Sequence, residues 1–254
     1  MKYSLPYDGA KEMLLVEDVD NRVFLESLFN AVYNELPEPK KNRKIKLIRG
    51  SLMKINTENM EWIRPPKKYE VTSDKIVIIT EPFTDLWQRT YYHFRNDNAP
   101  VLQMKTDEKY FSFTVKTEFD SKVRFDQSGI VMYLDSDNWL KASIEYENSE
   151  IQRLGSVVTN NGYSDWSSVD IDAKIKSTWF RLSRREDDFC IENSTDGINF
   201  KQMRICHMFN VEDTVQFGIY ACSPENSSFK AIFTHMEITE CKWLAHDGQQ
   251  PDEE

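Results

Sequence analysis

The sequence has few of the residues on which phosphate-binding loops, metal sites and membrane spans depend. Only eight glycines occur in 254 residues, and no glycine-rich phosphate-binding loop is present. The four histidines and four cysteines show neither metal-ligand spacing nor a closely spaced cysteine pair. No stretch approaches the roughly 18 apolar residues of a membrane-spanning helix. We therefore expect no metal, no other cofactor and no transmembrane helix.

The N-terminus and the cysteines together predict a compartment. The first ten residues lack the apolar stretch of a signal peptide. The simplest interpretation is a cytoplasmic protein whose cysteines, Cys190, Cys206, Cys222 and Cys241, stay reduced. Disulfide formation is the alternative, if the chain is secreted by a route that its sequence does not reveal.

The charge balance excludes two classes of partner. Acidic residues number 42 against 32 basic ones, which gives a net charge of −10. An acidic surface repels phosphate groups, so we expect neither nucleic acid nor an anionic membrane as a partner. The local exception is a basic run between residues 40 and 46, which is typical of a solvated linker.

Residues 1–50 predict an extension with a single amphipathic helix. Asp18 or Asn21 can cap it, and Pro37 and Pro39 end it. Its apolar positions recur at spacings of three and four: Phe24, Leu25, Leu28, Phe29, Val32 and Leu36. One such helix cannot bury its own apolar face. We expect it to pack on the following domain or to bind a protein partner, including a second copy in a homodimer.

From residue 51 the helical period disappears and a period of two replaces it, which predicts an all-β domain over residues 51–244. Short apolar or alternating segments recur with turns between them. The expected strands are Lys75–Thr80, Tyr110–Phe119, Gly129–Leu134, Trp139–Tyr146, Ser156–Asn160, Trp179–Ser183, Phe189–Asn193, Val215–Cys222 and Phe229–Ile238. Many strands without intervening helices favour a jelly-roll sandwich of two antiparallel sheets. The acidic tail, residues 245–254, is expected to be disordered.

The strand over residues 139–146 is the most informative segment for function. Leu140, Ala142 and Ile144 alternate with Trp139, Lys141, Ser143 and Glu145, so the two sets face opposite sides of a sheet. An indole, an amine and a carboxylate on one face could stack on a sugar and bind its hydroxyls. The alternative is a solvated strand face with a Lys–Glu pair.

The segment over residues 157–167 is too polar to continue a strand beyond Asn160, so a loop is expected there. It nevertheless contains Tyr163 and Trp166 beside Asn160 and Asp165. Loops of this composition form the rims of sugar sites. The alternative is a structural loop in which Asp165 caps backbone groups and Trp166 fills the sandwich.

Two further segments contain candidate ligand residues. Trp87 lies in an aromatic stretch, residues 83–92, which suits core packing as well as binding. Arg181 shares a strand face with Trp179 and Ser183, where its guanidinium could pair with an acid or with a ligand.

Catalysis finds little support in the sequence. No Ser-His-Asp arrangement is readable. Residues 145–150 have the spacing of the Glu-x-Asp-x-x-Glu strand of sandwich glucanases, in which two carboxylates flank the scissile bond. The central acid, however, is Glu147 instead of Asp, and Asn148-Ser149 is typical of a turn. A glycoside hydrolase that uses Glu145 and Glu150 is therefore the least favoured hypothesis.

Several motifs occur in an order that resembles a known family. They are residues 60–66 (MEWIRPP), 84–88 (TDLWQ), 97–100 (DNAP), 137–141 (DNWLK), 156–160 (SVVTN), 162–167 (GYSDWS), 194–197 (STDG) and 218–224 (GIYACSP). Over roughly residues 52–243 the chain resembles the domain-of-unknown-function family named for the yeast regulator of enolase. The first 50 residues show no resemblance to it.

The resemblance implies a fold, a surface and two further hypotheses. The family is similar in fold to concanavalin A-like lectins and glucanases, and to accessory domains of β-xylosidases. This similarity implies a ligand on the concave sheet, at Trp87, Trp139, Lys141, Glu145, Asn160, Asp165 and Trp166. The resemblance implies no reaction, because this fold occurs in both lectins and enzymes. A non-catalytic protein that binds an oligosaccharide is the leading hypothesis. A protein-interaction module that regulates a metabolic enzyme such as enolase is the second.

Overall fold

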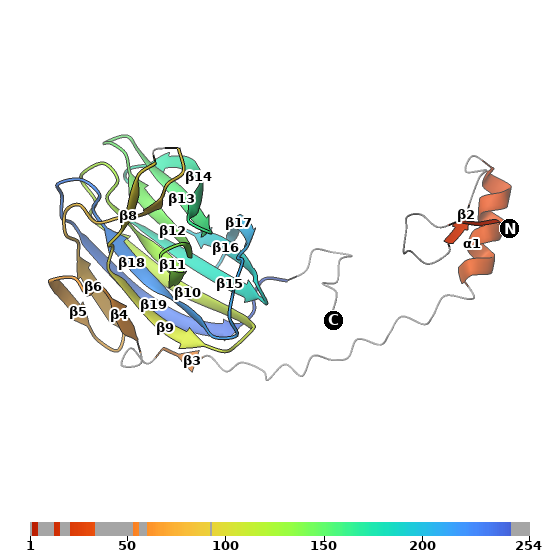
Figure 1. Ribbon diagram of the computed structural model, residues 1–254, viewed down its shortest axis with the longest axis horizontal. Helices are drawn as coiled ribbons and strands as arrows, with labels where there is room; N and C mark the ends of the chain where they lie inside the picture. Colours follow the sequence, from red (N-terminus) through yellow and green to blue (C-terminus); the bar gives the residue numbers. More distant parts are fainter. Residues whose placement is uncertain are drawn as a thin grey trace. The chain divides into compact units, whose positions relative to one another are not determined.

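The computed structural model describes residues 2–4, 13–15, 21–33, 53–55, 60–91 and 93–244. The chain separates into two compact units, Met1–Arg49 and Gly50–Glu254 (Figure 1). Within the described residues, no helix combines the length and the apolar character that a membrane crossing requires. The predicted disordered tail lies outside the described residues.

The first unit contains a short hairpin and the predicted helix. Strand β1 (Lys2–Ser4) pairs antiparallel with β2 (Met13–Leu15), and α1 spans Arg22–Tyr33. The Asn21 side chain accepts a hydrogen bond from the Phe24 amide at 3.0 Å, so Asn21 caps the helix. The expected helix end at Pro37 lies outside the described residues.

The second unit is a sandwich of two antiparallel sheets, which confirms the all-β prediction. The first sheet runs in the order β17 (Lys201–His207), β16 (Asp188–Ser194), β15 (Ser177–Arg185), β10 (Tyr110–Phe119), β19 (Lys230–Glu240), β6 (Lys75–Ile79) and β5 (Lys68–Val71), and β3 (Met53–Lys54) also pairs with β19. The second sheet runs β14 (Tyr163–Asp172), β13 (Ile151–Asn160), β12 (Asn138–Tyr146), β11 (Gln127–Asp135), β18 (Val215–Cys222), β9 (Val101–Thr106) and β4 (Glu61–Ile63).

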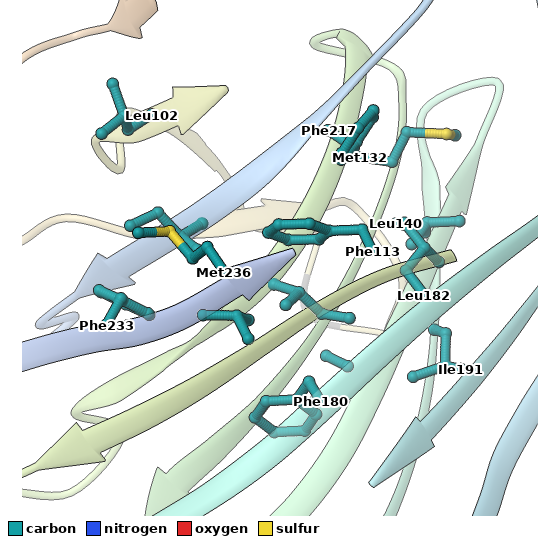
Figure 2. Close-up of a cluster of buried hydrophobic side chains, with 14 of the residues drawn as sticks. Leu102, Phe113, Met132, Leu140, Phe180, Leu182, Ile191, Phe217, Phe233 and Met236 are labelled. Atoms are coloured by element: carbon teal, nitrogen blue, oxygen red, sulfur yellow. The ribbon is translucent and has the colours of Figure 1, made fainter. Parts of the chain in front are cut away.

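Alternation along the strands builds the core between the sheets. Phe113 of β10 and Leu182 of β15 face Leu140 of β12 and Phe217 of β18, and all four side chains are fully buried (Figure 2). The Phe217 ring lies 5.2 Å from the Phe113 ring. Full burial of such side chains contributes about 1.5–3 kcal/mol each. This core fixes which face of each strand points away from it.

A third layer covers part of the second sheet on the side away from this core, which we call the outer face. It is the hairpin of β7 (Leu86–Gln88) and β8 (Arg95–Asp97), which pair with each other alone (Figure 1). Leu86 packs there in a second apolar cluster with Val131, Trp139 and Tyr220. The outer face is therefore closed over its central strands.

The nine predicted strand segments match observed strands, except that Thr80 and Phe229 lie one residue outside β6 and β19. One predicted loop is wrong. Residues 163–172 form β14, a ten-residue edge strand that pairs with β13 along its whole length. Most of its side chains are exposed. An edge strand gains its ladder of backbone hydrogen bonds on one side only and needs no apolar face, so its polar sequence hid it.

Candidate functional site

The side chains of β12 have the predicted facing but not the predicted accessibility. Leu140, Ala142 and Ile144 lie in the core between the sheets, and Trp139 packs on the outer face. Trp139 is 0% exposed and Lys141 is 3% exposed. The expectation that they form an accessible ligand surface is wrong, because the β7–β8 hairpin covers them.

The ammonium group of Lys141 lies at the centre of a buried polar cluster. It donates hydrogen bonds to the Leu86 carbonyl and to Gln127 Oε1, both at 2.8 Å. The Asp85 carboxylate lies 3.7 Å from Nζ. The Trp139 and Tyr220 rings lie at 5.7 and 5.4 Å from the same nitrogen. Polar partners and ring faces thus replace the water that the ammonium loses on burial.

Gln127 connects this amine to the other polar groups of the cluster. Its Oε1 accepts a second hydrogen bond, from the Tyr220 hydroxyl at 2.8 Å. Its Nε2 donates to Glu145 Oε2 at 3.3 Å and to the Phe125 carbonyl. Gln127 and Glu145 are directly opposite each other on β11 and β12. The Gln127 side-chain amide therefore turns its oxygen toward the Lys141 ammonium and its NH₂ group toward the Glu145 carboxylate.

Two carboxyl groups share the single amine, and burial shifts the pKa of each. Burial raises the pKa of Asp85, against the opposing effect of the Lys141 charge and the Leu86 amide. Burial also raises the pKa of Glu145 to about 7; Lys141 opposes this shift and Asp85 adds to it. A carboxyl group that titrates near neutral pH beside an open part of the sheet is a common feature of functional sites.

Polar contacts at both ends hold the covering hairpin to the sheet. The Gln88 side chain donates to the Ser136 carbonyl, and the Gln88 amide donates to Ser164 Oγ at 2.9 Å. At the other end Arg64 donates to the Ala99 carbonyl at 2.9 Å and lies 3.4 Å from Asp97. The cover is thus attached through long-range contacts that local sequence patterns do not reveal.

Beyond the hairpin the outer face becomes accessible at its edge on β14, where Trp166 and Asp170 are exposed, whereas Val157 of β13 is buried. Glu145, Arg153 and Asp170 lie side by side on neighbouring strands as a charged row. The next row along the strands contains only small residues: Ser143, Gly155 and Ser168. These small residues let a large neighbouring ring lie close against the sheet, beside the charged row.

Trp166 lies one row further on and is a large aromatic side chain at this accessible edge. Its indole is 38% exposed. A Cβ atom built on Gly155 would lie 3.0 Å from the indole Nε1, so the ring rests against the bare backbone of Gly155. The Arg153 guanidinium lies 5.4 Å from the ring centroid. We call Glu145, Arg153, Gly155, Trp166 and Asp170 the β13–β14 site.

The remaining predicted site residues have structural contacts and do not join this site. The Asn160 side chain donates a hydrogen bond to the His207 carbonyl and accepts one from the Phe209 amide. Asp165 pairs with Arg204 at 2.6 Å on the other face of β14. Arg181 belongs to the first sheet and pairs with Glu192 through two hydrogen bonds. Trp87 packs, partly buried, against the outer-face apolar cluster.

The carboxylate pair required by the hydrolase hypothesis is not formed. Glu150 is exposed in the turn between β12 and β13, whereas Glu145 lies on the outer face. Glu147 pairs with Arg124 at 3.0 Å and with Arg153 at 3.4 Å. Among the described residues, no group of three or more His, Cys, Asp or Glu could hold a metal ion.

Sequence reasoning missed six members of the two clusters, among them Asp170 of β14. Asp85, Gln127 and Tyr220 are distant from β12 in sequence, and only the three-dimensional pairing brings them to Lys141. Gly155 and Arg153 become prominent once β14 is a strand, because its register places Trp166 beside both. A glycine inside an otherwise regular strand was the available signal for close approach by another group.

The fold and the site define an all-β protein, a sandwich of two antiparallel sheets. A family described as "Protein of unknown function (DUF1349)" matches residues 62–241, and the chain belongs to this family. The chain is 30% identical over 186 residues to "Regulation of enolase protein 1" of Saccharomyces cerevisiae, across 72% of this chain and 92% of that protein. The resemblance found in the sequence is confirmed.

Solved structures share the sandwich. A functionally unknown protein from Saccharomyces cerevisiae is 28% identical with a TM-score of 0.67, over 72% of this chain and 97% of that one. The GH43 BlXynB protein from Bacillus licheniformis is 15% identical with a TM-score of 0.55, over 72% of this chain and 37% of that one. At that identity, the likeness to the GH43 protein concerns the fold alone.

Replacing Lys141 should destabilise the sandwich strongly. A Lys141→Met variant leaves the buried Asp85 carboxylate without its cation, which typically costs about 3–5 kcal/mol. Urea denaturation measures the loss. Lys122→Met, at a lysine whose side chain is 72% exposed, should change stability by less than about 0.5 kcal/mol. The double variant Asp85→Asn with Lys141→Met should lose less than the sum of the single changes; strict additivity would contradict the pairing.

The raised pKa of Glu145 predicts a pH-dependent stability difference. Since the folded pKa is about 7 against an ordinary 4.5, the folded state binds more protons than the unfolded state between these values. Stability from this group is complete below pH 4.5 and is lost as the pH rises through 7. Glu145→Gln should therefore match the parent at pH 4.5 and exceed it in stability at pH 8, by roughly 1–3 kcal/mol. A stability difference between the parent and Glu145→Gln that stays constant from pH 4.5 to pH 8 in urea denaturation would contradict the raised pKa.

Proposed function

We propose that the sandwich is a concanavalin A-like, non-catalytic carbohydrate-binding domain whose ligand lies on the β13–β14 site. The observation that supports this proposal most directly is the partly exposed Trp166 indole, which rests on Gly155 beside a charged row. A flat aromatic ring next to hydrogen-bonding side chains matches the alternating apolar and hydroxyl surfaces of a sugar.

Several features of the site favour an oligosaccharide over a compact apolar ligand. Arg153, Glu145 and Asp170 supply donors and acceptors along one edge of the small-residue row. The charged row ends at the edge of the sheet, on β14, where Asp170 is exposed. A shallow site of this kind binds with modest affinity, in the millimolar range, or about −4 kcal/mol.

Substitution of Trp166 tests the proposal. Titration calorimetry with xylo- and gluco-oligosaccharides should give millimolar binding, and Trp166→Ala should weaken it roughly tenfold because the stacking contact is lost. Val169→Ala is the matched control, since Val169 is 59% exposed on the same strand but on its other face. Equal affinities for the parent and Trp166→Ala, or no binding at millimolar ligand, would refute the proposal.

Binding to a metabolic enzyme is the second candidate function. The name of the yeast relative refers to regulation of enolase. Helix α1 adds a physical argument, because Val23 and Phe24 are 78% and 44% exposed in the first unit. Exposed apolar side chains on one helix are typical anchors of helix-mediated protein contacts.

A direct binding measurement tests this second candidate. The full chain, mixed with purified enolase from the same organism, should form a stoichiometric complex that size-exclusion chromatography with light scattering detects. Phe24→Ser should weaken the complex at least tenfold, whereas Trp166→Ala should leave it intact. If no complex forms at micromolar concentrations, or if Phe24→Ser has no effect, the helix is not a docking site for enolase.

A further inference from the structure

The tip of the β7–β8 hairpin borders a surface hollow of about 460 Å³ that is separate from the β13–β14 site. Its lining comes from the hairpin tip and from the first residue of β14: Arg89, Thr90, Tyr91, His93, Arg95 and Tyr163. Tyr163 and Trp166 are three positions apart on one strand and so project to opposite faces. The hollow therefore does not share the Trp166 ring.

The hollow is rich in positive charge on a chain whose net charge is −10. Arg89 is anchored: it donates to the Gly162 carbonyl at 3.0 Å and lies 3.6 Å from Asp137. Arg95 is exposed and donates to Ser136 Oγ at 3.4 Å. In the part of the chain that the structure describes, Arg95 forms no ion pair with a carboxylate. Its guanidinium is thus available to an anion.

Two tyrosines also line the hollow. Tyr163 is 63% exposed, and the Arg89 guanidinium lies 6.0 Å from its ring centroid. Tyr91 is 82% exposed. Two exposed tyrosines beside two arginines offer a stacking surface and hydroxyl groups close to a site for negative charge.

Three described residues of the hairpin tip adopt an unfavourable backbone conformation. Arg89, Tyr91 and His93 have φ angles of 54°, 65° and 53°. The left-handed conformation is uncommon for residues other than glycine, and it persists only where the surroundings enforce it. The Arg89 amide donates to the Phe94 carbonyl at 2.7 Å, and the His93 amide donates to the Arg89 carbonyl at 2.9 Å. Strain of this kind is concentrated at ligand sites.

We infer that the hollow binds a small sugar that carries an oxyanion, either a phosphate ester or a carboxylate. Arg95 and the anchored Arg89 bind the oxyanion, and Tyr163 contacts the sugar ring. The arginine fork matches the oxygen spacing of both groups, so the chemistry common to them defines the ligand class.

Calorimetric titration of the full chain tests this inference with four probes: glucose 6-phosphate, glucuronate, glucose and inorganic phosphate. At least one charged sugar should bind with a dissociation constant of 1 mM or below, and at least tenfold more tightly than glucose or phosphate. Arg95→Gln should weaken that binding at least tenfold. Lys122→Gln, which removes an exposed charge elsewhere, should leave it unchanged. The preferred probe distinguishes a phosphate ester from a carboxylate.

Other results overturn the inference. They are no binding by either charged sugar, equal binding of glucose, equal binding of inorganic phosphate, or unchanged affinity in Arg95→Gln. Tyr163→Ala is the second variant if Arg95→Gln fails to fold, and it should weaken the charged sugar at least fivefold; unchanged affinity would overturn the inference. Trp166→Ala should leave charged-sugar binding intact, so failure of the β13–β14 site and failure of the hollow are separately visible.

Discussion

The buried ammonium group of Lys141 is the constraint on which the outer face of the second sheet depends. A lysine on a central strand can lose its hydration only if other groups replace water around it. Asp85 and the Leu86 carbonyl, from the segment that leads into the hairpin, supply part of that replacement, and Gln127 supplies the rest. The segment that leads into the hairpin therefore supplies groups that the Lys141 ammonium needs in place of water. Burial of Lys141 on this strand depends on the hairpin for that reason.

The sequence was sufficient for the layers of the sandwich, because alternation is a local signal. In β10 and β12 the residues at every second position enter the core, and Phe113 and Leu140 do so as expected. The turns after Asp135 and at Asp196 form for the same local reason: each carboxylate accepts a hydrogen bond from the backbone amide two residues further on. Patterns of this kind involve neighbours in sequence, so a single chain reveals them.

The candidate site was less predictable, because it depends on contacts between distant residues. Facing alone could not distinguish a covered strand face from an open one. The cover comes from Leu86 and Gln88, more than 50 residues before Trp139 along the chain. The polar composition of β14 concealed a strand, since an edge position removes the requirement for an apolar face. Trp166 was already a candidate in the sequence, but its neighbours Arg153 and Gly155 were not.

Because the hairpin buries the central strands, the accessible side chains of the outer face lie at the edge of the sheet, on β14. The hairpin closes the face above Trp139 and Lys141, and the closure leaves Glu145 at the border between the buried cluster and the open row with Arg153. Its carboxyl group bonds Gln127 on the closed side, so its protonation state responds to the interior charges of Lys141 and Asp85. A ligand placed along the open row would remove further water from the same carboxyl group and favour its protonated form. Glu145 thus connects the buried cluster around Lys141 to the β13–β14 site. The packing of the hairpin therefore affects the charge of a carboxyl group in that site.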